Sequence, residues 1–160
     1  VNGKPDENER LFSIMKESTD ARQKFFETGE IVYEKQMPDV DENSNQLRKE
    51  AYEYYCTSRG LCPNYGENRM AVISKDTRRS FDITDQIKLL SPRPYLAIAG
   101  TKALTFGLSK TAFERAREPK EFFEIEGATH VGLYDKEEYV NPAIVKLTEF
   151  YKEKWNVSSS

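Results

Sequence analysis

Two short apolar runs near the end of the chain stand out from a largely polar pattern. Tyr95–Ala99 is a continuous apolar run followed by Gly100, and residues 122–125 form a second run followed by Gly127. Continuous runs of this length are typical of strands that are covered on both faces. Because the segment from Ser109 to Glu118 has helical spacing, we predict two parallel strands joined by a crossover helix, with Ser109 as the N-cap of that helix.

Most of the remaining chain is predicted to be helical. Four segments have apolar residues at helical spacing or clear helix start and stop signals. They are residues 5–29 with Gly29 as the stop, an N-cap at Ser44 followed by a helix to Gly60, Asn68–Asp76, and a last helix that begins at Asn141-Pro142. The predicted fold class is therefore α/β, mostly helical by content, with residues 1–80 as a helical segment and residues 81–160 carrying the strands.

Composition excludes several kinds of partner. Charged residues make up 32% of the chain and hydrophobic residues 38%, and the net charge is −3. Without a basic stripe there is no case for nucleic-acid binding. The longest apolar run, Tyr95–Ala99, is far too short to cross a membrane, and the opening VNGKPDENER lacks the order of a signal peptide. We expect a cytoplasmic protein with no nucleic-acid and no membrane partner.

The chain offers few ligands for a metal. Two cysteines, Cys56 and Cys62, and one histidine are too few soft ligands for a zinc site, so we expect no metal and no cofactor. Free thiols are favoured over a disulfide between the two cysteines, because disulfides are rare in cytoplasmic proteins. The glycosylation triplet Asn156-Val157-Ser158 matters only in a secreted protein.

The single histidine, His130, follows the second predicted strand in the order Gly127-Ala128-Thr129-His130. In serine-type acyl transfer, a histidine base must lie within hydrogen-bond reach of a nucleophile, and a carboxylate must orient that base. In α/β-hydrolases the nucleophile lies in a G-x-S-x-G motif. No serine or cysteine of this chain has that context, so the sequence provides a candidate base and no nucleophile.

Several segments resemble one branch of the α/β-hydrolase superfamily. From about Leu47 to Trp155 the chain is similar to the carboxyl-terminal half of an uncharacterised branch grouped with dienelactone-hydrolase-like and polyketide-transferase-like proteins. The matching segments are RKEAYEYYCTSRG, NRMAVIS, FDITDQIKLLSPRPYLAIAG, KTAFERAREPKEFFEIEGATHV, LYDKEEYV and PAIVKLTEFY.

The resemblance implies a partial α/β-hydrolase fold and a role for His130. Residues 1–80 would contain helices of a cap, and residues 81–160 would form the carboxyl-terminal part of the core. The nucleophile elbow and oxyanion strand would lie upstream of Val1. The implied reaction of the complete protein is hydrolysis of an ester or a related acyl or C–C bond in a small molecule, with His130 as the general base. This chain alone is expected to be inactive.

Two positions depart from the family pattern. The resemblance places Leu104 where the family carries its acidic residue, and Gly132 where members tend to have Asp two residues after the histidine. Leucine cannot accept a hydrogen bond from an imidazole. Asp135 is the nearest substitute acid in sequence, and Glu126 is the next.

These departures keep a second hypothesis open. A non-catalytic α/β-hydrolase-like binding or interaction domain would use the aromatic region of Tyr54, Tyr55 and Phe81 as an apolar surface. Tyr54, Tyr55 and Leu104 are the candidate substrate-binding residues under the first hypothesis, although an aromatic stripe at helical spacing is more often core. A two-stranded sheet with an open edge also predicts self-association. An unrelated small helical module is a third hypothesis, which requires Tyr95–Ala99 to be helical.

Overall fold

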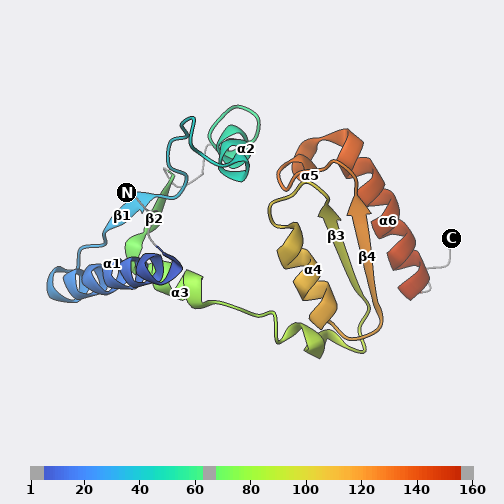
Figure 1. The fold of residues 1–160 in the computed structure, drawn as a ribbon, viewed down its shortest axis with the longest axis horizontal. Coiled ribbons are helices and arrows are strands. Elements are labelled where there is room, and N and C mark those ends of the chain that lie inside the picture. Colours follow the sequence, from blue (N-terminus) through green and yellow to red (C-terminus); the bar gives the residue numbers. More distant parts are fainter. Residues whose placement is uncertain (1–5, 63–67, 156–160) are drawn as a thin grey trace. The chain divides into compact units, whose positions relative to one another are not determined.

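The computed structural model describes residues 6–62 and 68–155, and Figure 1 shows the order of the elements. The glycosylation triplet and most of the turn predicted after Cys62 lie outside the described residues. The elements in chain order are α1 (Glu7–Thr28), β1 (Tyr33–Lys35), α2 (Gln46–Tyr55), β2 (Arg69–Ala71), the 3₁₀ turn η1 (Val72–Ser74), α3 (Lys75–Ser80), the 3₁₀ turn η2 (Ile87–Leu90), β3 (Tyr95–Gly100), α4 (Phe106–Arg115), β4 (Lys120–Ile125), α5 (Gly132–Asp135) and α6 (Glu137–Trp155).

The chain divides into two compact units. The amino-terminal unit consists of Val1–Glu42 and Tyr52–Phe81, and the carboxyl-terminal unit consists of Asn43–Ala51 and Asp82–Ser160. The boundary between them falls within α2.

α1 begins and ends at strong helix signals. Asp6 forms a capping box with Glu9, in which each side chain bonds the backbone N–H of the other residue. Gly29 ends the helix in the left-handed conformation at φ 73°, which glycine adopts without strain. The predicted helix over residues 5–29 is therefore confirmed, including its stop.

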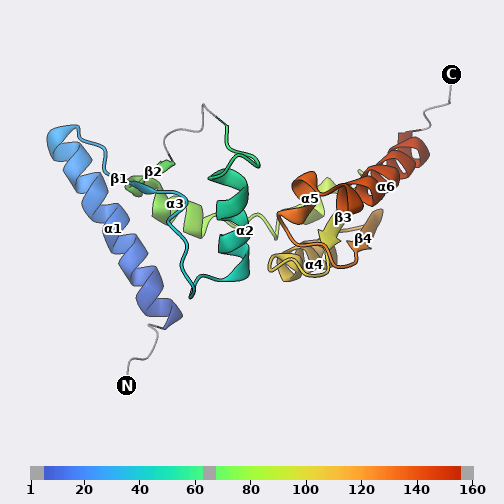
Figure 2. The same cartoon turned by 90° about the horizontal axis from the view of Figure 1, so that it is seen from above.

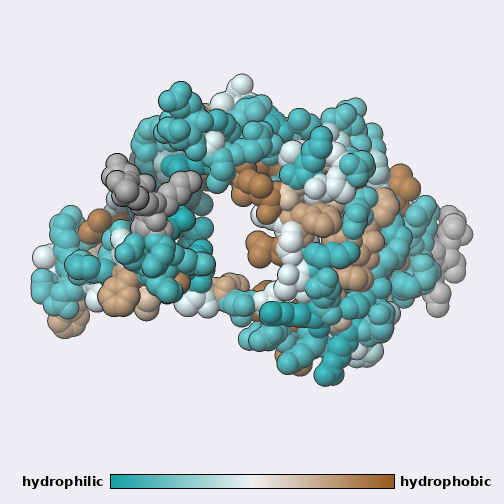
Figure 3. Space-filling view, in the orientation of Figure 1, coloured by the Kyte–Doolittle hydropathy of each residue, from teal (hydrophilic) through white to brown (hydrophobic). Residues whose placement is uncertain are grey.

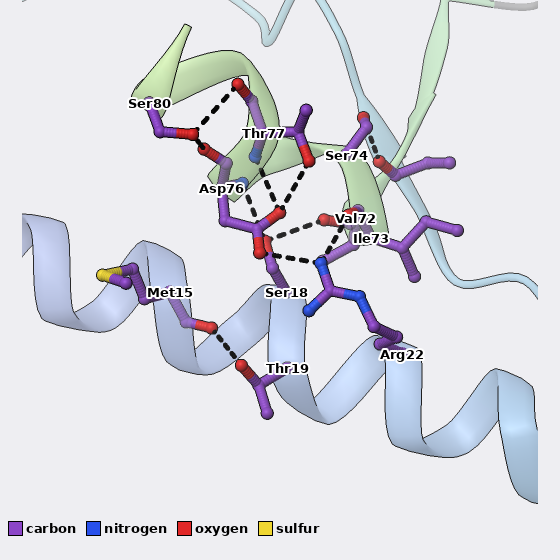
Figure 4. Close-up of polar contacts among 11 residues, drawn as sticks. Met15, Ser18, Thr19, Arg22, Val72, Ile73, Ser74, Asp76, Thr77 and Ser80 are labelled. Carbon is purple, nitrogen blue, oxygen red and sulfur yellow. Dashed lines mark hydrogen bonds and ion pairs between the residues drawn. The ribbon is translucent and has the colours of Figure 1, made fainter.

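A buried hydroxyl connects α1 to the segment that follows β2. Ser18 has no exposed surface, and its Oγ donates to the Val72 carbonyl at 3.2 Å and accepts from the Asp76 N–H at 3.1 Å. One turn along, the Arg22 guanidinium bonds the Asp76 carboxylate at 2.7 Å and the Ile73 carbonyl at 3.3 Å (Figure 4). These contacts fix α1 across η1 and the start of α3.

Carboxylates in this unit are paired with cations. Lys75 lies between Glu17 at 2.5 Å and Glu34 at 2.9 Å. The hydrogen bond from Lys75 lowers the pKa of Glu17, and the hydrogen bond from Arg22 lowers the pKa of Asp76. Both carboxylates are thus stabilised in their charged form by contacts that exist only in the folded unit.

The helix predicted over Asn68–Asp76 is wrong in its first half. Residues 69–71 form β2, which pairs antiparallel with β1 in the register Tyr33 to Ala71. Asn68 precedes β2 at φ 53°, and its side-chain amide bonds both the N–H and the carbonyl of Met37, at 2.7 and 2.8 Å. The asparagine therefore replaces a helical start with a turn that leads the chain into an antiparallel strand.

The carboxyl-terminal unit contains the predicted parallel strands. β3 and β4 pair in parallel from Tyr95 opposite Lys120 to Gly100 opposite Ile125, with α4 as the connection. Within the described residues, neither strand pairs with a third. The strand predictions and the parallel crossover are confirmed, and the hypothesis of a small helical module is wrong because Tyr95–Ala99 is a strand.

The two helices next to this sheet cover opposite faces (Figure 2). Phe122 on β4 contacts the rings of Phe106 and Phe113 on α4. The neighbouring residues of β4 point the other way, and Lys146 of α6 lies 5.8 Å from the ring centroid of Phe123. Side chains that alternate along a strand in this way place a sheet between two helical layers.

Helix starts in this unit differ from the predictions. α4 begins at Phe106 with Thr105 in the N-cap position, so Ser109 lies inside the helix. α6 begins at Glu137, and Pro142 lies inside it. In α2, the side chain of Asn45 accepts from the N–H of Arg48 at 2.9 Å and caps the helix in place of Ser44. Each true start lies next to acidic or cap-forming residues that the apolar spacing did not reveal.

Candidate functional site

The loops that follow β3 and β4 are tied together by hydrogen bonds. The Gly127 N–H donates to Thr101 Oγ1 at 2.9 Å, and the Lys102 N–H donates to the Ala128 carbonyl at 3.0 Å. Gly127 has φ 74°, so the chain turns there directly after β4. The loop after β4 is thus anchored to the loop after β3 before it reaches His130.

A close approach between the two loops depends on Gly100. A Cβ atom at this position would lie 2.2 Å from the carbonyl oxygen of Ala128 and 2.6 Å from its carbonyl carbon. Ala128 itself has no exposed surface. Only glycine at the end of β3 leaves room for the backbone that leads to the histidine.

The Nδ1 atom of His130 lies 2.9 Å from Oγ1 of Thr105. Thr105 occupies the N-cap position of α4, but its side chain makes no capping hydrogen bond. Threonine is a common cap residue, so its hydroxyl would ordinarily accept from the first turn of the helix. Here the hydroxyl is directed to the imidazole instead.

The other ring nitrogen of His130 is bonded by a tyrosine. Nε2 lies 2.8 Å from the hydroxyl of Tyr134, and the two rings meet edge to face with centroids 5.4 Å apart. The short helix α5 carries Tyr134 and is fixed at its start, where the Gly132 N–H donates to Thr129 Oγ1 at 3.0 Å. The imidazole is therefore held between two hydroxyl groups, one from the start of α4 and one from α5.

These side chains line a cavity of about 230 Å³ at the carboxyl ends of the strands, the edge where open α/β sheets bind ligands. None of the lining residues is charged. They are Ile98, Ala99, Gly100, Ala103, Thr105, Leu108, Ser109, His130, Leu133 and Tyr134. A larger cavity of about 380 Å³ lies at the opposite end of β3, against the last turns of α6, and does not include the histidine. The smaller cavity is the candidate site because it combines an apolar lining with a titratable base.

Two hydroxyl groups bond the ring nitrogens of His130, and the role of Asp135 as the substitute acid stays a prediction. Asp135 lies at the end of α5 and is exposed, and the hydrogen-bond partners of Nδ1 and Nε2 are Thr105 and Tyr134. Glu126 is also exposed. Leu104, at the family's acid position, has 62% of its surface exposed and lies next to Thr105 in the chain. Thr105, one position after Leu104, thus supplies the hydrogen-bond partner of Nδ1.

The aromatic pair predicted to bind substrate belongs to the amino-terminal unit. Tyr54 and Tyr55 meet edge to face at 5.1 Å, and the guanidinium of Arg59 lies 5.4 Å from the Tyr54 ring centroid. The Tyr54 ring also packs so closely on Gly60 that a Cβ there would be 2.7 Å from it. These contacts give the ring a packing role within its own unit. A substrate-binding role for the pair stays a prediction.

Among the described residues, no group of three or more His, Cys, Asp or Glu side chains is arranged to hold a metal ion. Cys56 and Cys62 are both free. Across the described ranges, no helix is both long enough and apolar enough to cross a membrane.

No protein-family model matches the chain. Two curated proteins are similar to the chain, and both have the name of an uncharacterized protein. PA2218 of Pseudomonas aeruginosa is 35% identical over 118 residues, which cover 72% of this chain and 32% of PA2218. YcjY of Escherichia coli strain K12 is 31% identical over 121 residues, which cover 73% of this chain and 38% of YcjY. The chain thus spans about a third of the length of the curated relatives it matches.

Solved structures resemble almost the whole chain. The crystal structure of the hypothetical protein PA2218 superposes with a TM-score of 0.81 at 29% identity, covering 96% of this chain and 47% of that one. DcsB, solved in complex with its substrate analogue, gives a TM-score of 0.75 at 20% identity, covering 93% of this chain and 53% of DcsB. The α/β hydrolase GrgF from Penicillium sp. sh18 gives 0.66 at 21% identity, covering 92% and 50%. The chain therefore has a partial α/β-hydrolase fold, as predicted.

Proposed function

We propose that this chain is the part of a serine-type α/β-hydrolase that supplies the histidine base. In the proposal, the complete protein hydrolyses an ester, or a related acyl or C–C bond, of a small molecule. His130 takes the proton from a serine that lies outside this chain. The branch is the one that the sequence resembles, grouped with dienelactone-hydrolase-like and polyketide-transferase-like proteins.

The observation that carries the proposal is the position of the imidazole. His130 lies at the carboxyl ends of two parallel strands, and its Nδ1 is bonded by a side chain from the loop after the neighbouring strand. A base in serine-type hydrolysis needs such an orienting partner on Nδ1 so that Nε2 is directed at the nucleophile. Thr105 takes the orienting position in place of a carboxylate.

A hydroxyl is a weaker partner than a carboxylate for this purpose. It can fix the orientation of the ring, but it has no negative charge to stabilise the imidazolium that forms when the base accepts a proton. We therefore propose a slow hydrolase whose geometry is retained and whose electrostatic assistance is reduced.

The lining of the cavity supports an apolar substrate group. Leu108 and Leu133 contribute apolar side chains, and none of the ten lining residues carries a full charge. A buried cavity of about 150 Å³ can hold a benzene molecule, so about 230 Å³ suits a short acyl chain or a single aromatic ring. An anionic group would find no cation among the lining residues.

The missing nucleophile fits the length of the relatives. The sequence has no G-x-S-x-G motif, and the relatives are about two to three times as long as the parts of them that match. In the proposal, residues 1–80 belong to the helical cap segment and residues 81–160 to the carboxyl-terminal core. The chain alone should then be inactive, since a base with nothing to activate contributes little.

The test uses the complete product of the reading frame and p-nitrophenyl esters from acetate to octanoate. We expect hydrolysis that is lost in His130→Ala and retained in the matched control Lys102→Ala, an exposed residue of the same region. Full activity in His130→Ala would favour a non-catalytic role for this unit. Absence of hydrolysis on every ester, or hydrolysis by the 160-residue chain alone, would also contradict the proposal.

A further inference from the structure

Tyr134 occupies the ring nitrogen that a nucleophile would need. In a serine-type site, Nδ1 faces the orienting residue and Nε2 faces the nucleophile. In this chain the Tyr134 hydroxyl is 2.8 Å from Nε2, while Thr105 Oγ1 is 2.9 Å from Nδ1. A nucleophile can therefore reach Nε2 only after the phenol has moved.

The two hydroxyls differ in how well they donate. A neutral imidazole has one N–H and one lone pair, so one hydroxyl must donate to the ring while the other accepts from it. A phenol, with an ordinary pKa of about 10, is a far stronger acid than an aliphatic alcohol and so the better donor. The favoured arrangement has Tyr134 donating to Nε2, and the Nδ1–H of His130 donating to Thr105.

We propose that Tyr134 is a latch on the histidine base. It holds His130 in the tautomer with a proton on Nδ1 and a lone pair on Nε2, which is the tautomer that a general base requires. It also covers that lone pair until the nucleophile displaces the phenol. The latch would regulate the catalytic site of the proposed hydrolase, so its role in catalysis rests on the proposed function.

The surroundings of Tyr134 suit such a movement. The residue lies in a helix of only four residues, and 42% of its surface is exposed. Its neighbours Val131 and Gly132 are buried, so the start of α5 is anchored while the tyrosine ring lies at the surface. A rotation of the side chain toward solvent would free Nε2 without opening the core of the unit.

The tautomer can be measured on this chain because His130 is its single histidine. Nitrogen-15 NMR of the imidazole distinguishes a protonated ring nitrogen from an unprotonated one, and only one pair of ring signals is present. We expect Nδ1 protonated and Nε2 unprotonated at neutral pH. In Tyr134→Phe we expect a shift toward the Nε2–H form, which dominates in an unconstrained imidazole. In the matched control Thr105→Val, we expect the Nδ1–H form to persist because the phenol still donates.

A second measurement reports access to the lone pair. Diethyl pyrocarbonate acylates a free imidazole nitrogen, and the signal from histidine is unambiguous here. The acylation rate at Nε2 is divided by the fraction of molecules in the Nδ1–H tautomer, which the nitrogen-15 spectra give. Loss of one hydrogen bond of ordinary net strength should raise this corrected rate by about 2- to 10-fold in Tyr134→Phe. Thr105→Val should react on Nε2 at the rate of the parent chain. Backbone amide spectra of β3 and β4 check that both variants fold.

Two results would overturn the latch. One is an Nε2–H tautomer in the parent chain, and the other is a Tyr134→Phe variant with the tautomer and acylation rate of the parent. Neither result bears on ester hydrolysis by the complete protein, which depends on His130 itself. Failure of the latch and failure of the proposed function are therefore seen in separate experiments.

Discussion

Replacing Gly100 by alanine tests how the loops of the candidate site are held together. The added Cβ would lie 2.2 Å from the carbonyl oxygen of Ala128 and 2.6 Å from its carbonyl carbon. Both atoms are backbone, and Ala128 is fully buried, so no side-chain rotation relieves the overlap. The same carbonyl accepts from the Lys102 N–H at 3.0 Å, and a displacement large enough to admit a methyl group would break that bond.

The expected loss of stability follows from these two effects. Overpacking a well-packed site costs about 1–3 kcal/mol. The loss of a backbone hydrogen bond adds about 0.5–1.5 kcal/mol. The sum, about 2–4 kcal/mol, should lower the Tm of the carboxyl-terminal unit by roughly 10–30 °C, because 1 kcal/mol shifts the Tm of a unit of this size by about 4–8 °C.

Gly107 provides the matched control for this variant. A Cβ at Gly107 would have no atom within 4 Å, and the residue lies in the first turn of α4. Alanine is preferred over glycine in a helix by about 0.5–1 kcal/mol, so Gly107→Ala should leave the Tm unchanged or raise it slightly. Thermal unfolding followed by circular dichroism measures both variants. A Gly100→Ala chain as stable as its parent would refute the close approach of the two loops.

Four further predictions concern other parts of the chain. Ser18→Ala should destabilise the amino-terminal unit by about 1–2 kcal/mol in urea unfolding, since it removes a buried hydroxyl that bonds two backbone groups and leaves the Asp76 N–H without that acceptor. Thr19→Ala, one residue on, should have little effect. Folding lowers the pKa values of Glu17 and Asp76, so the stability that these carboxylates contribute is complete above their unfolded pKa values and is lost as the pH falls through the folded ones. The urea concentration at the unfolding midpoint of this unit should therefore decrease when the pH is lowered below about 4, and it should stay constant between about pH 6 and 8. Thr105→Asp places a carboxylate beside Nδ1 and should raise ester hydrolysis by the complete protein at least about tenfold; an unchanged or lower rate would exclude Thr105 as the orienting residue. The edge of β3 that faces away from β4 should support self-association, which sedimentation velocity over a range of concentrations would show; a monomer at every concentration argues against it.

The parallel strands could be predicted because burial on both faces leaves a plain signature. Tyr95–Ala99 is apolar throughout, and the strand that it forms pairs with β4, whose alternate side chains contact α4 and α6. The helical segment between the strands then required a parallel pair, since a crossover helix joins parallel neighbours. The apolar pattern of the strands and the connection between them therefore both predict a parallel pair.

Helix boundaries could not be predicted where a side chain has a second partner. Asn68 turns the chain by bonding both backbone groups of Met37, a residue 31 positions away. Asn141-Pro142 predicts a helix start, but α6 begins earlier, at Glu137, and includes the proline. Contacts distant in sequence and alternative starts within one turn are not encoded in the spacing of apolar residues.

The candidate site was predicted in part. His130 could be located from its place after a strand and a glycine, but its two partners could not. The sequence favours a carboxylate, Asp135, as the partner of the imidazole. In the structure the hydroxyls of Thr105 and Tyr134 bond its two nitrogens. Tyr134 does lie four residues after His130, a spacing that brings side chains together on one turn of helix, and this was the one available signal. Thr105 lies 25 residues from His130 in the sequence, and the two meet only because the loop after β3 packs against the loop after β4.

Whether His130 is the base of a hydrolase is measured by the rate at which the complete protein hydrolyses p-nitrophenyl esters. General-base catalysis contributes about 10²–10⁴-fold to such reactions, so His130→Ala should lower kcat by at least about 10² while Lys102→Ala does not. A His130→Ala protein that hydrolyses the same ester at the rate of its parent would contradict the account.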